Sequence, residues 1–294
     1  MIISRALALP MTLLVLVCAA QQTKAPRPNS LRLYVLDCGT LDHPDYAQLT
    51  PQQINQKLAF YTLKREEVAT HVMSVPCFLV AHPRGTLMWD VGAVPDSNFK
   101  PGAASATERF ATATKPLRTQ LAGAGYSPAD IAYVAFSHFH WDHTANGNMF
   151  SGSTWLVPQP ERDIMFAEPP SDRTIPSNYV ALENSKTQIL GQTDYDVFGD
   201  GAVVIKPAPG HSPGHQVLFL KLAKIGPVVL SGDLYHYPEE RTLNRLPVNE
   251  FNREQTAESR REIETFLKKT GAQLWIQHDY TANSQLRKAP AFYE

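Results

Sequence analysis

The sequence has little cysteine, no excess of charge of one sign and no long apolar run after its first residues. Lys and Arg number 27 against 28 Asp and Glu, which gives a net charge of −1. No bulk basic field is therefore available to recruit nucleic acid or anionic lipid, and a small or neutral substrate fits better. The hydrophobic share of 43% in 294 residues is ample for a sizeable core, which excludes a disordered chain.

Cysteine occurs only three times. Cys18 belongs to the N-terminal apolar segment, whereas Cys38 and Cys77 each lie inside a strand-like run and lack the spacing of a metal site. In an oxidising compartment the last two could form a disulfide if their strands are neighbours. Two buried thiols are the simpler expectation.

The first 22 residues have the pattern of a secretory signal peptide. Arg5 precedes an apolar run from Ala6 to Val17, which leads into small residues ending at Ala20. The run is too short for a comfortable membrane span, and nothing later in the chain resembles one. We expect cleavage near Ala20 and export to the periplasm or the medium. A lipoprotein signal ending in Cys18 is a minor alternative, because Val17 is bulkier than such sites usually accept.

After this leader we expect a linker over residues 23–30 and one domain over residues 31–294, since no second linker divides the remaining chain. Strand-like segments alternate with helical ones, which suggests two sheets covered by helices. The composition of residues 103–125 is helical, and residues 252–269 form the clearest amphipathic helix. A weaker helical pattern over residues 49–65 is expected to cover a pocket.

The most informative stretch is Ser137-His138-Phe139-His140-Trp141-Asp142-His143. It follows the apolar run 131–136, so the polar side chains fall where a buried strand ends. Imidazole nitrogens and carboxylates are the ligands that Zn²⁺ prefers. This spacing can serve two neighbouring ions, with His138 and His140 at one ion and Asp142 and His143 at the other.

Three more candidate ligands follow predicted strands further along the chain. His211 lies in a Pro- and Gly-rich turn between strands, Asp233 follows the strand 228–230, and His278 follows the strand 273–277. We expect His211 to join His138 and His140, His278 to join Asp142 and His143, and Asp233 to bridge two divalent ions, most simply Zn²⁺. Alternatively, Asp233 caps a turn and His278 packs within a strand. His215 and His236 lie near ligands in sequence and are candidate supporting residues.

The H-x-H-x-D-H run, with the later Pro-Gly-His, Gly-Asp and His-Asp elements, resembles the metallo-β-lactamase superfamily. Three segments are similar to N-acyl homoserine lactonases in particular: PGHSPGHQ at 209–216, LYVLDCG at 33–39 and WDVG at 89–92. The resemblance extends from about Leu31 to His278. It implies an α/β (α+β) fold of the αββα type, with two mixed β-sheets flanked by helices.

The same resemblance implies a di-zinc hydrolase that opens the lactone ring of N-acyl homoserine lactones, a quorum-quenching activity. Two ions that share a water lower its pKa from about 15.7 towards neutrality, so a metal-bridging hydroxide attacks the ester carbonyl. Asp142 or Asp233 can accept and return the proton. In the lactonases a tyrosine three places after the bridging aspartate assists the substrate. Here that position is His236, flanked by Tyr235 and Tyr237, and we expect one of these to donate a hydrogen bond to the oxyanion.

Other readings of the same ligands remain open. A glyoxalase II-like thioesterase or another di-metal esterase would use the same seven side chains, whereas the presence of Asp233 weighs against a β-lactamase. A non-catalytic metal-binding module should lack a ligand, and none is missing. A nucleic-acid hydrolase is disfavoured by the lack of basic surface. An acyl chain would need an apolar groove, for which Tyr46, Phe60, Tyr61, Phe166 and Tyr179 are candidates, although such aromatics are as often core. A homodimer remains an open alternative to a monomer.

Overall fold

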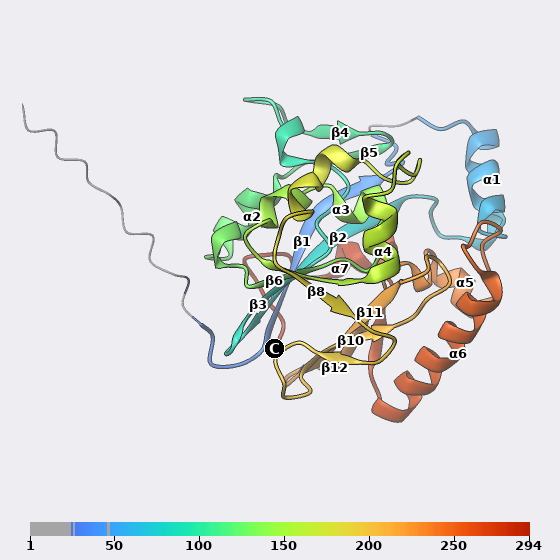
Figure 1. The fold of residues 1–294 in the computed structure, drawn as a ribbon. Helices are drawn as coiled ribbons and strands as arrows, with labels where there is room; N and C mark the ends of the chain where they lie inside the picture. The colour runs from blue at the N-terminus through green and yellow to red at the C-terminus, as the bar shows by residue number, and fades with distance from the viewer. Residues whose placement is uncertain (1–24, 26, 46–47) are drawn as a thin grey trace, which may run out of the picture.

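Two mixed β-sheets pack face to face and carry helices on their outer surfaces (Figure 1). The computed structural model describes residues 25, 27–45 and 48–294. The predicted signal peptide, the alternative lipidation site at Cys18 and the candidate groove residue Tyr46 lie outside the described residues. The two sheets confirm the predicted αββα arrangement.

The first sheet has eight strands in the order β4-β5-β1-β2-β3-β6-β7-β8. Neighbours from β4 to β3 run antiparallel, and those from β3 to β8 run parallel. The strands are β1 (Arg32–Leu41), β2 (Met73–His82), β3 (Gly85–Trp89), β4 (Ala106–Glu108), β5 (Ala111–Ala113), β6 (Tyr133–Ala135), β7 (Thr154–Pro158) and β8 (Thr187–Leu190).

The second sheet has five strands in the order β13-β12-β11-β10-β9, and only the β12–β13 pair is parallel. The strands are β9 (Tyr195–Asp196), β10 (Val203–Pro207), β11 (Gln216–Leu222), β12 (Gly226–Leu230) and β13 (Gln273–Trp275). The helices are α1 (Pro51–Phe60), α2 (Leu117–Gly123), α3 (Trp141–Thr144), α4 (Gln159–Met165), α5 (Pro238–Thr242), α6 (Arg253–Thr270) and α7 (Tyr280–Gln285).

Alternating side chains of the strands build separate apolar layers, because successive residues of a strand point to opposite faces. In β11, Leu218 and Leu220 face the first sheet and join the central core. Val217 and Phe219 point the other way and meet Ile263 and Leu267 of α6. Burial of each such side chain contributes about 1.5–3 kcal/mol to the stability of the fold. One face of the second sheet therefore packs stably against the first sheet, and the other packs stably against α6.

The helix α6 confirms the strongest helical prediction. Asn252 caps its N-terminus by accepting a hydrogen bond from the Gln255 N–H, and Gly271 ends it in the left-handed conformation. Within the described residues, none of the helices combines the length and the apolar character needed to cross a bilayer.

The helical prediction for residues 103–125 is wrong in its first half. Only α2 is an α-helix there, and it is preceded by the short strands β4 and β5. Thr112 of β5 pairs with Thr40 at the end of β1. Pairing with this free sheet edge overrides the local composition, because strand propensity depends strongly on tertiary neighbours.

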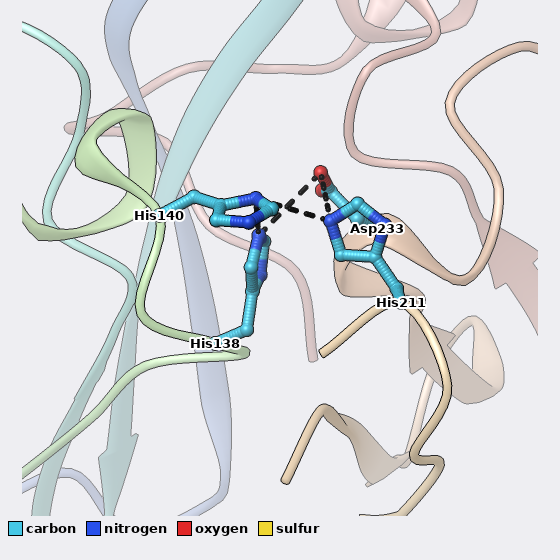
Figure 2. A group of neighbouring side chains, drawn as sticks. All are labelled: His138, His140, His211 and Asp233. Atoms are coloured by element: carbon cyan, nitrogen blue, oxygen red, sulfur yellow. Dashed lines mark hydrogen bonds and ion pairs between the residues drawn. The ribbon is translucent and has the colours of Figure 1, made fainter. Parts of the chain in front are cut away.

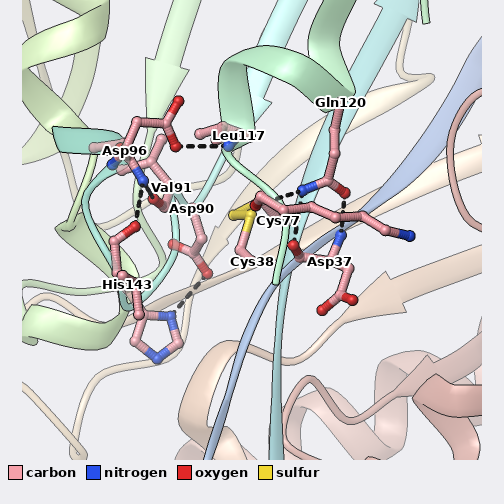
Figure 3. Close-up of a disulfide and its surroundings, with 12 residues drawn as sticks. Asp37, Cys38, Cys77, Asp90, Val91, Asp96, Leu117, Gln120 and His143 are labelled. Atoms are coloured by element: carbon pink, nitrogen blue, oxygen red, sulfur yellow. Dashed lines mark hydrogen bonds and ion pairs between the residues drawn. A yellow bond between two sulfur atoms is a disulfide. The ribbon is translucent and has the colours of Figure 1, made fainter. Parts of the chain in front are cut away.

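Cys38 and Cys77 form a disulfide, which corrects the expectation of two buried thiols (Figure 3). They lie on neighbouring strands, β1 and β2, whose register shifts between Asp37 and Thr40. The two Cα atoms are 5.8 Å apart, within the range of a disulfide. The sequence indicated both strands but not that they are neighbours. The disulfide forms because β1 and β2 lie side by side in the folded sheet.

Removing the disulfide by the double substitution Cys38→Ala and Cys77→Ala should destabilise the protein. The bond joins residues separated by 39 positions, and closing a loop of that length restricts the unfolded chain by about 3–4 kcal/mol. Denaturant unfolding of the two forms measures the difference. Alkylation of the unfolded, unreduced wild-type protein followed by mass spectrometry should label neither cysteine, and two labels would contradict the pairing.

Candidate metal centre

All seven predicted ligands meet at one edge of the two sheets, and all are buried. Residues 138–143 follow β6, and His211 lies between β10 and β11. Asp233 lies in a short 3-10 turn after β12, and His278 lies after β13. The ends of strands from both sheets therefore deliver the side chains to a common place, as their positions in the sequence predicted.

Two of the ligands follow glycines that other residues could not replace. Gly210 has φ +135°, and a Cβ there would lie 2.2 Å from the Thr256 nitrogen. Gly232 has φ +50°, and a Cβ there would lie 2.6 Å from the Ser137 Cβ. Each glycine thus lets its turn pack closely against a neighbouring segment, which fixes the direction of the ligand that follows.

The first cluster comprises His138, His140, His211 and Asp233 (Figure 2). His138 Nε2 lies 2.7 Å from His140 Nδ1, and His211 Nε2 lies 3.1 Å from the same atom. Asp233 Oδ2 lies 3.6 Å from His138 Nε2 and 3.4 Å from His211 Nε2. Three imidazole nitrogens and one carboxylate oxygen therefore face a common point.

The second cluster comprises Asp142, His143 and His278. Asp142 Oδ2 lies 3.8 Å from His143 Nε2 and 3.7 Å from His278 Nε2. Asp233 Oδ1 lies 3.1 Å from each of these two nitrogens. The two oxygens of Asp233 thus face different clusters, which is the arrangement expected of a bridging carboxylate.

The other ring nitrogens are held by residues behind the clusters. Asp90 Oδ2 lies 3.0 Å from His143 Nδ1 (Figure 3). The Ser74 carbonyl oxygen lies 2.8 Å from His278 Nδ1, and Glu250 Oε1 lies 3.3 Å from His211 Nδ1. Such partners fix the orientation of a histidine and leave its other nitrogen for a metal. Sequence reasoning did not give Asp90 or Glu250 this role, since no spacing pattern ties either one to its histidine.

The protonation of the first cluster suits a metal ion, whereas in the second cluster burial is outweighed by Asp233, Asp90 and Asp142, which hold the pKa of His143 well above the usual range. Burial and then the neighbouring histidines lower the pKa of His138 and His140 well below the usual range, so both rings are neutral, the form that binds metal. Burial opposes ionisation of Asp233, but His278, His143 and other histidines hold its pKa well below the usual range. Within the described residues, His143 Nε2 and Asp233 Oδ1 are buried without a hydrogen-bond partner. Cations between the clusters would satisfy both atoms, so the residues fit a binuclear metal site.

The residues after Asp233 separate into one that faces the centre and two that do not. His236 Nε2 lies 3.3 Å from Asp233 Oδ2, and His236 Nδ1 lies 3.3 Å from Glu240 Oε1. Burial lowers the pKa of His236, but Glu240 and Asp233 raise it to about 10. With Glu240 at Nδ1, the other ring nitrogen of His236 faces the centre. His215 also supports the site, because its Nε2 accepts from the Asp233 N–H at 2.9 Å.

Tyr235, one of the predicted catalytic residues, faces away from the centre. Its hydroxyl donates to Glu264 at 3.2 Å, and its ring packs below the Arg260 guanidinium, on the side of α6. The Tyr237 hydroxyl donates to the His71 carbonyl oxygen at 2.9 Å. Neither tyrosine lines the cavity above the clusters, whereas His236 does.

A cavity of about 660 Å³ opens onto both clusters. Its apolar wall includes Leu41, Leu49, Phe60, Met73 and Phe110. The helix α1 contributes to this wall, as expected for residues 49–65. Of the aromatic residues considered for a groove, Phe60 and Tyr61 line the cavity. Phe166 and Tyr179 instead pack against each other in the core, beside α4.

Glu161 on α4 connects the two loops that carry the first cluster. Its Oε2 accepts the Phe139 N–H at 2.8 Å, between His138 and His140. Its Oε1 accepts the Ser212 hydroxyl and the Gly214 N–H, both at 2.7 Å, next to His211. Burial raises the pKa of Glu161 to about 7, although these three donors act to lower it. Sequence reasoning missed this residue, because a lone glutamate in a short helix carries no distinguishing signal.

The substitution Glu161→Gln should destabilise the protein and loosen the first cluster. A glutamine side chain keeps only one oxygen acceptor, so its NH2 group must face either the Phe139 N–H or the Ser212 and Gly214 donors, and an unsatisfied buried donor costs about 1–3 kcal/mol. Denaturant unfolding and the metal content after dialysis measure the two effects. Glu183→Gln, at an exposed position, is the matched control. Equal stability and equal metal retention in both variants would show that Glu161 does not hold the loops.

Comparison with known proteins gives a consistent result. A family model described as the metallo-beta-lactamase superfamily matches residues 72–270. The N-acyl homoserine lactonase AttM of Azorhizobium caulinodans is 27% identical over 280 residues, which cover 90% of this chain and 100% of that protein. An N-acyl homoserine lactonase of Bacillus cereus is 26% identical over 227 residues, which cover 75% of this chain and 87% of that protein.

Solved structures share the fold. An N-acyl homoserine lactone hydrolase, with the product N-hexanoyl-L-homoserine at its catalytic metal centre, has a TM-score of 0.67 and 23% identity, covering 89% of this chain and 98% of its own. AidC, a dizinc quorum-quenching lactonase, has a TM-score of 0.56 and 18% identity, covering 92% and 96% respectively. These comparisons confirm the resemblance drawn from the motifs.

Proposed function

We propose that this chain, which belongs to the metallo-β-lactamase superfamily, opens the lactone ring of N-acyl homoserine lactones with two bound Zn²⁺ ions. The observation that carries the proposal is the pair of buried clusters that share Asp233 at the base of a largely apolar cavity. Relatives named N-acyl homoserine lactonase, similar over most of their length, support the choice of substrate.

The residues divide the work by position. His138, His140, His211 and Asp233 would hold one ion, and Asp142, His143, His278 and Asp233 the other. Bound divalent ions lower the pKa of a coordinated water and polarise an ester carbonyl. Asp142 lines the cavity beside His278, where its carboxylate can accept a proton during attack and return it to the leaving alkoxide.

His236 is placed to assist the substrate. It lines the cavity, and its Nε2 lies 3.3 Å from Asp233 Oδ2. Its ring is packed against Tyr61, with 4.7 Å between ring centroids, and held by Glu240. A fixed N–H donor of this kind stabilises negative charge that develops on an oxygen.

Lactone opening releases a carboxylic acid, so a pH-indicator assay measures it directly. Purified protein should contain two zinc ions per chain and acidify solutions of N-hexanoyl and N-decanoyl homoserine lactone, with loss of turnover on chelation. Asp233→Asn should lower kcat/KM by more than about a hundredfold, since even the outer partners of metal ligands are worth about 10–100-fold. Asp163→Asn, at an exposed position, is the control. Turnover of S-lactoylglutathione without turnover of lactones would favour the thioesterase alternative.

We also propose that the protein is exported and that its leader is removed near Ala20. The apolar segment after Arg5 supports export, and the Cys38–Cys77 disulfide suits an oxidising compartment. Expression of the full sequence in a bacterial host, with mass measurement of the product from the periplasm or the medium, tests this. An intact Met1 on protein confined to the cytoplasm would overturn it.

A further inference from the structure

The cavity wall contains a buried ion pair that lactone hydrolysis itself does not require. Lys57 Nζ lies 2.8 Å from Asp42 Oδ2, with side chains 15% and 9% exposed, and both residues line the cavity. Lys57 also donates to the His71 carbonyl oxygen at 2.9 Å. Buried charges are rare, and apolar residues in their place are often neutral or stabilising. Stability alone therefore does not explain this pair.

The backbone on both sides places the pair at the cavity. Asp42 directly follows β1 and has φ 55°, a left-handed conformation that a residue other than glycine adopts at a cost. On α1, Gln53, Lys57 and Phe60 all line the cavity, and their spacing puts them on one face of the helix. Leu58 points into the core and anchors α1 from behind.

The chemistry of the pair matches a secondary amide. An ammonium group has three N–H donors, and the Asp42 carboxylate and the His71 carbonyl take two of those of Lys57. The remaining donor suits an amide oxygen, and the Asp42 carboxylate can accept from an amide N–H. The two charges cancel, so the pair offers hydrogen bonds without demanding a charged ligand.

The position also matches such a group. Asp42 and Lys57 line the same cavity as Asp142 and His278 of the second cluster. Leu41, adjacent to Asp42, and Met73 continue the wall as apolar surface. A lactone ring over the clusters would thus have an amide-binding pair beside it and an apolar surface beyond.

We propose that Asp42 and Lys57 bind the amide that joins the acyl chain to the lactone ring, and so select N-acylated lactones over lactones with a plain alkyl chain. This inference rests on the proposed lactone hydrolysis. Asp42 and Lys57 act as specificity residues, whereas the seven ligands act on the ester.

Two probes separate the inference from the chemistry of the centre. N-decanoyl homoserine lactone has the amide, and α-decyl-γ-butyrolactone has the same ring with an apolar chain at the same carbon and no amide. The wild-type holoenzyme should prefer the first. Lys57→Met should lower kcat/KM for the first probe by about tenfold to a hundredfold, mainly through a higher KM. The loss of a hydrogen bond to a charged group weakens binding by about this factor. The value of kcat/KM for the second probe should fall far less.

Further variants guard against a simple folding defect. Asp42→Leu combined with Lys57→Met removes both charges together and should lower the ratio of kcat/KM for the amide probe to kcat/KM for the alkyl probe, as Lys57→Met does. Lys100→Met, at an exposed position, should leave kcat/KM for both probes unchanged. Equal losses on both probes, or an unchanged ratio of kcat/KM, would overturn the inference and leave lactone hydrolysis standing. If the wild-type enzyme turns over neither probe, the proposed function fails and this inference fails with it.

Discussion

The carboxylate of Asp233 is the group on which the rest of the site depends. Five histidines, His138, His143, His211, His236 and His278, place a ring nitrogen between 3.1 and 3.6 Å from one of its oxygens. A buried carboxylate among so many imidazoles is stable only when positive charge accompanies it. The loops that converge on Asp233 therefore form a site that needs positive charge, which bound cations would supply whatever substrate occupies the cavity.

The convergence is maintained by bonds between segments that are distant in the chain. Asp90 follows β3 and holds His143, Ser74 lies on β2 and holds His278, and Glu250 precedes α6 and holds His211. Glu161 on α4 ties the loop of His138 to the loop of His211. Because each bond joins a different pair of elements, the geometry of the clusters is a property of the whole domain and not of a single loop.

The two clusters could be predicted because their signal is local. The spacing of residues 138–143 and the polar residues after later strands are visible without knowing how the strands pair. The supporting residues could not be predicted in this way, since the contacts of Glu161 and Glu250 arise only when separate elements meet. The predictions for Cys38 and Cys77 and for the segment of β5 failed for the same reason, because both features depend on which strand lies next to β1.

The choice between Tyr235 and His236 illustrates a different limit. Tyr235 has φ −141° and ψ 137°, an extended conformation, and successive residues of an extended segment point to opposite sides. A shift of one position thus decides whether a side chain reaches the centre or the side of α6. The pattern of three consecutive aromatic rings does not reveal this phase.

The seven ligands all lie between positions 138 and 278, whereas α1 and much of the apolar cavity wall come from the chain before residue 111. Of the residues of α1, only Leu58 is buried. Substitutions on the side of that helix that lines the cavity, at Gln53, Lys57 or Phe60, therefore change the wall without removing a residue of either cluster. Such a division lets natural selection alter the cavity wall and the two clusters separately, so descendants of one ancestral gene can acquire new substrates while inheriting an unchanged centre.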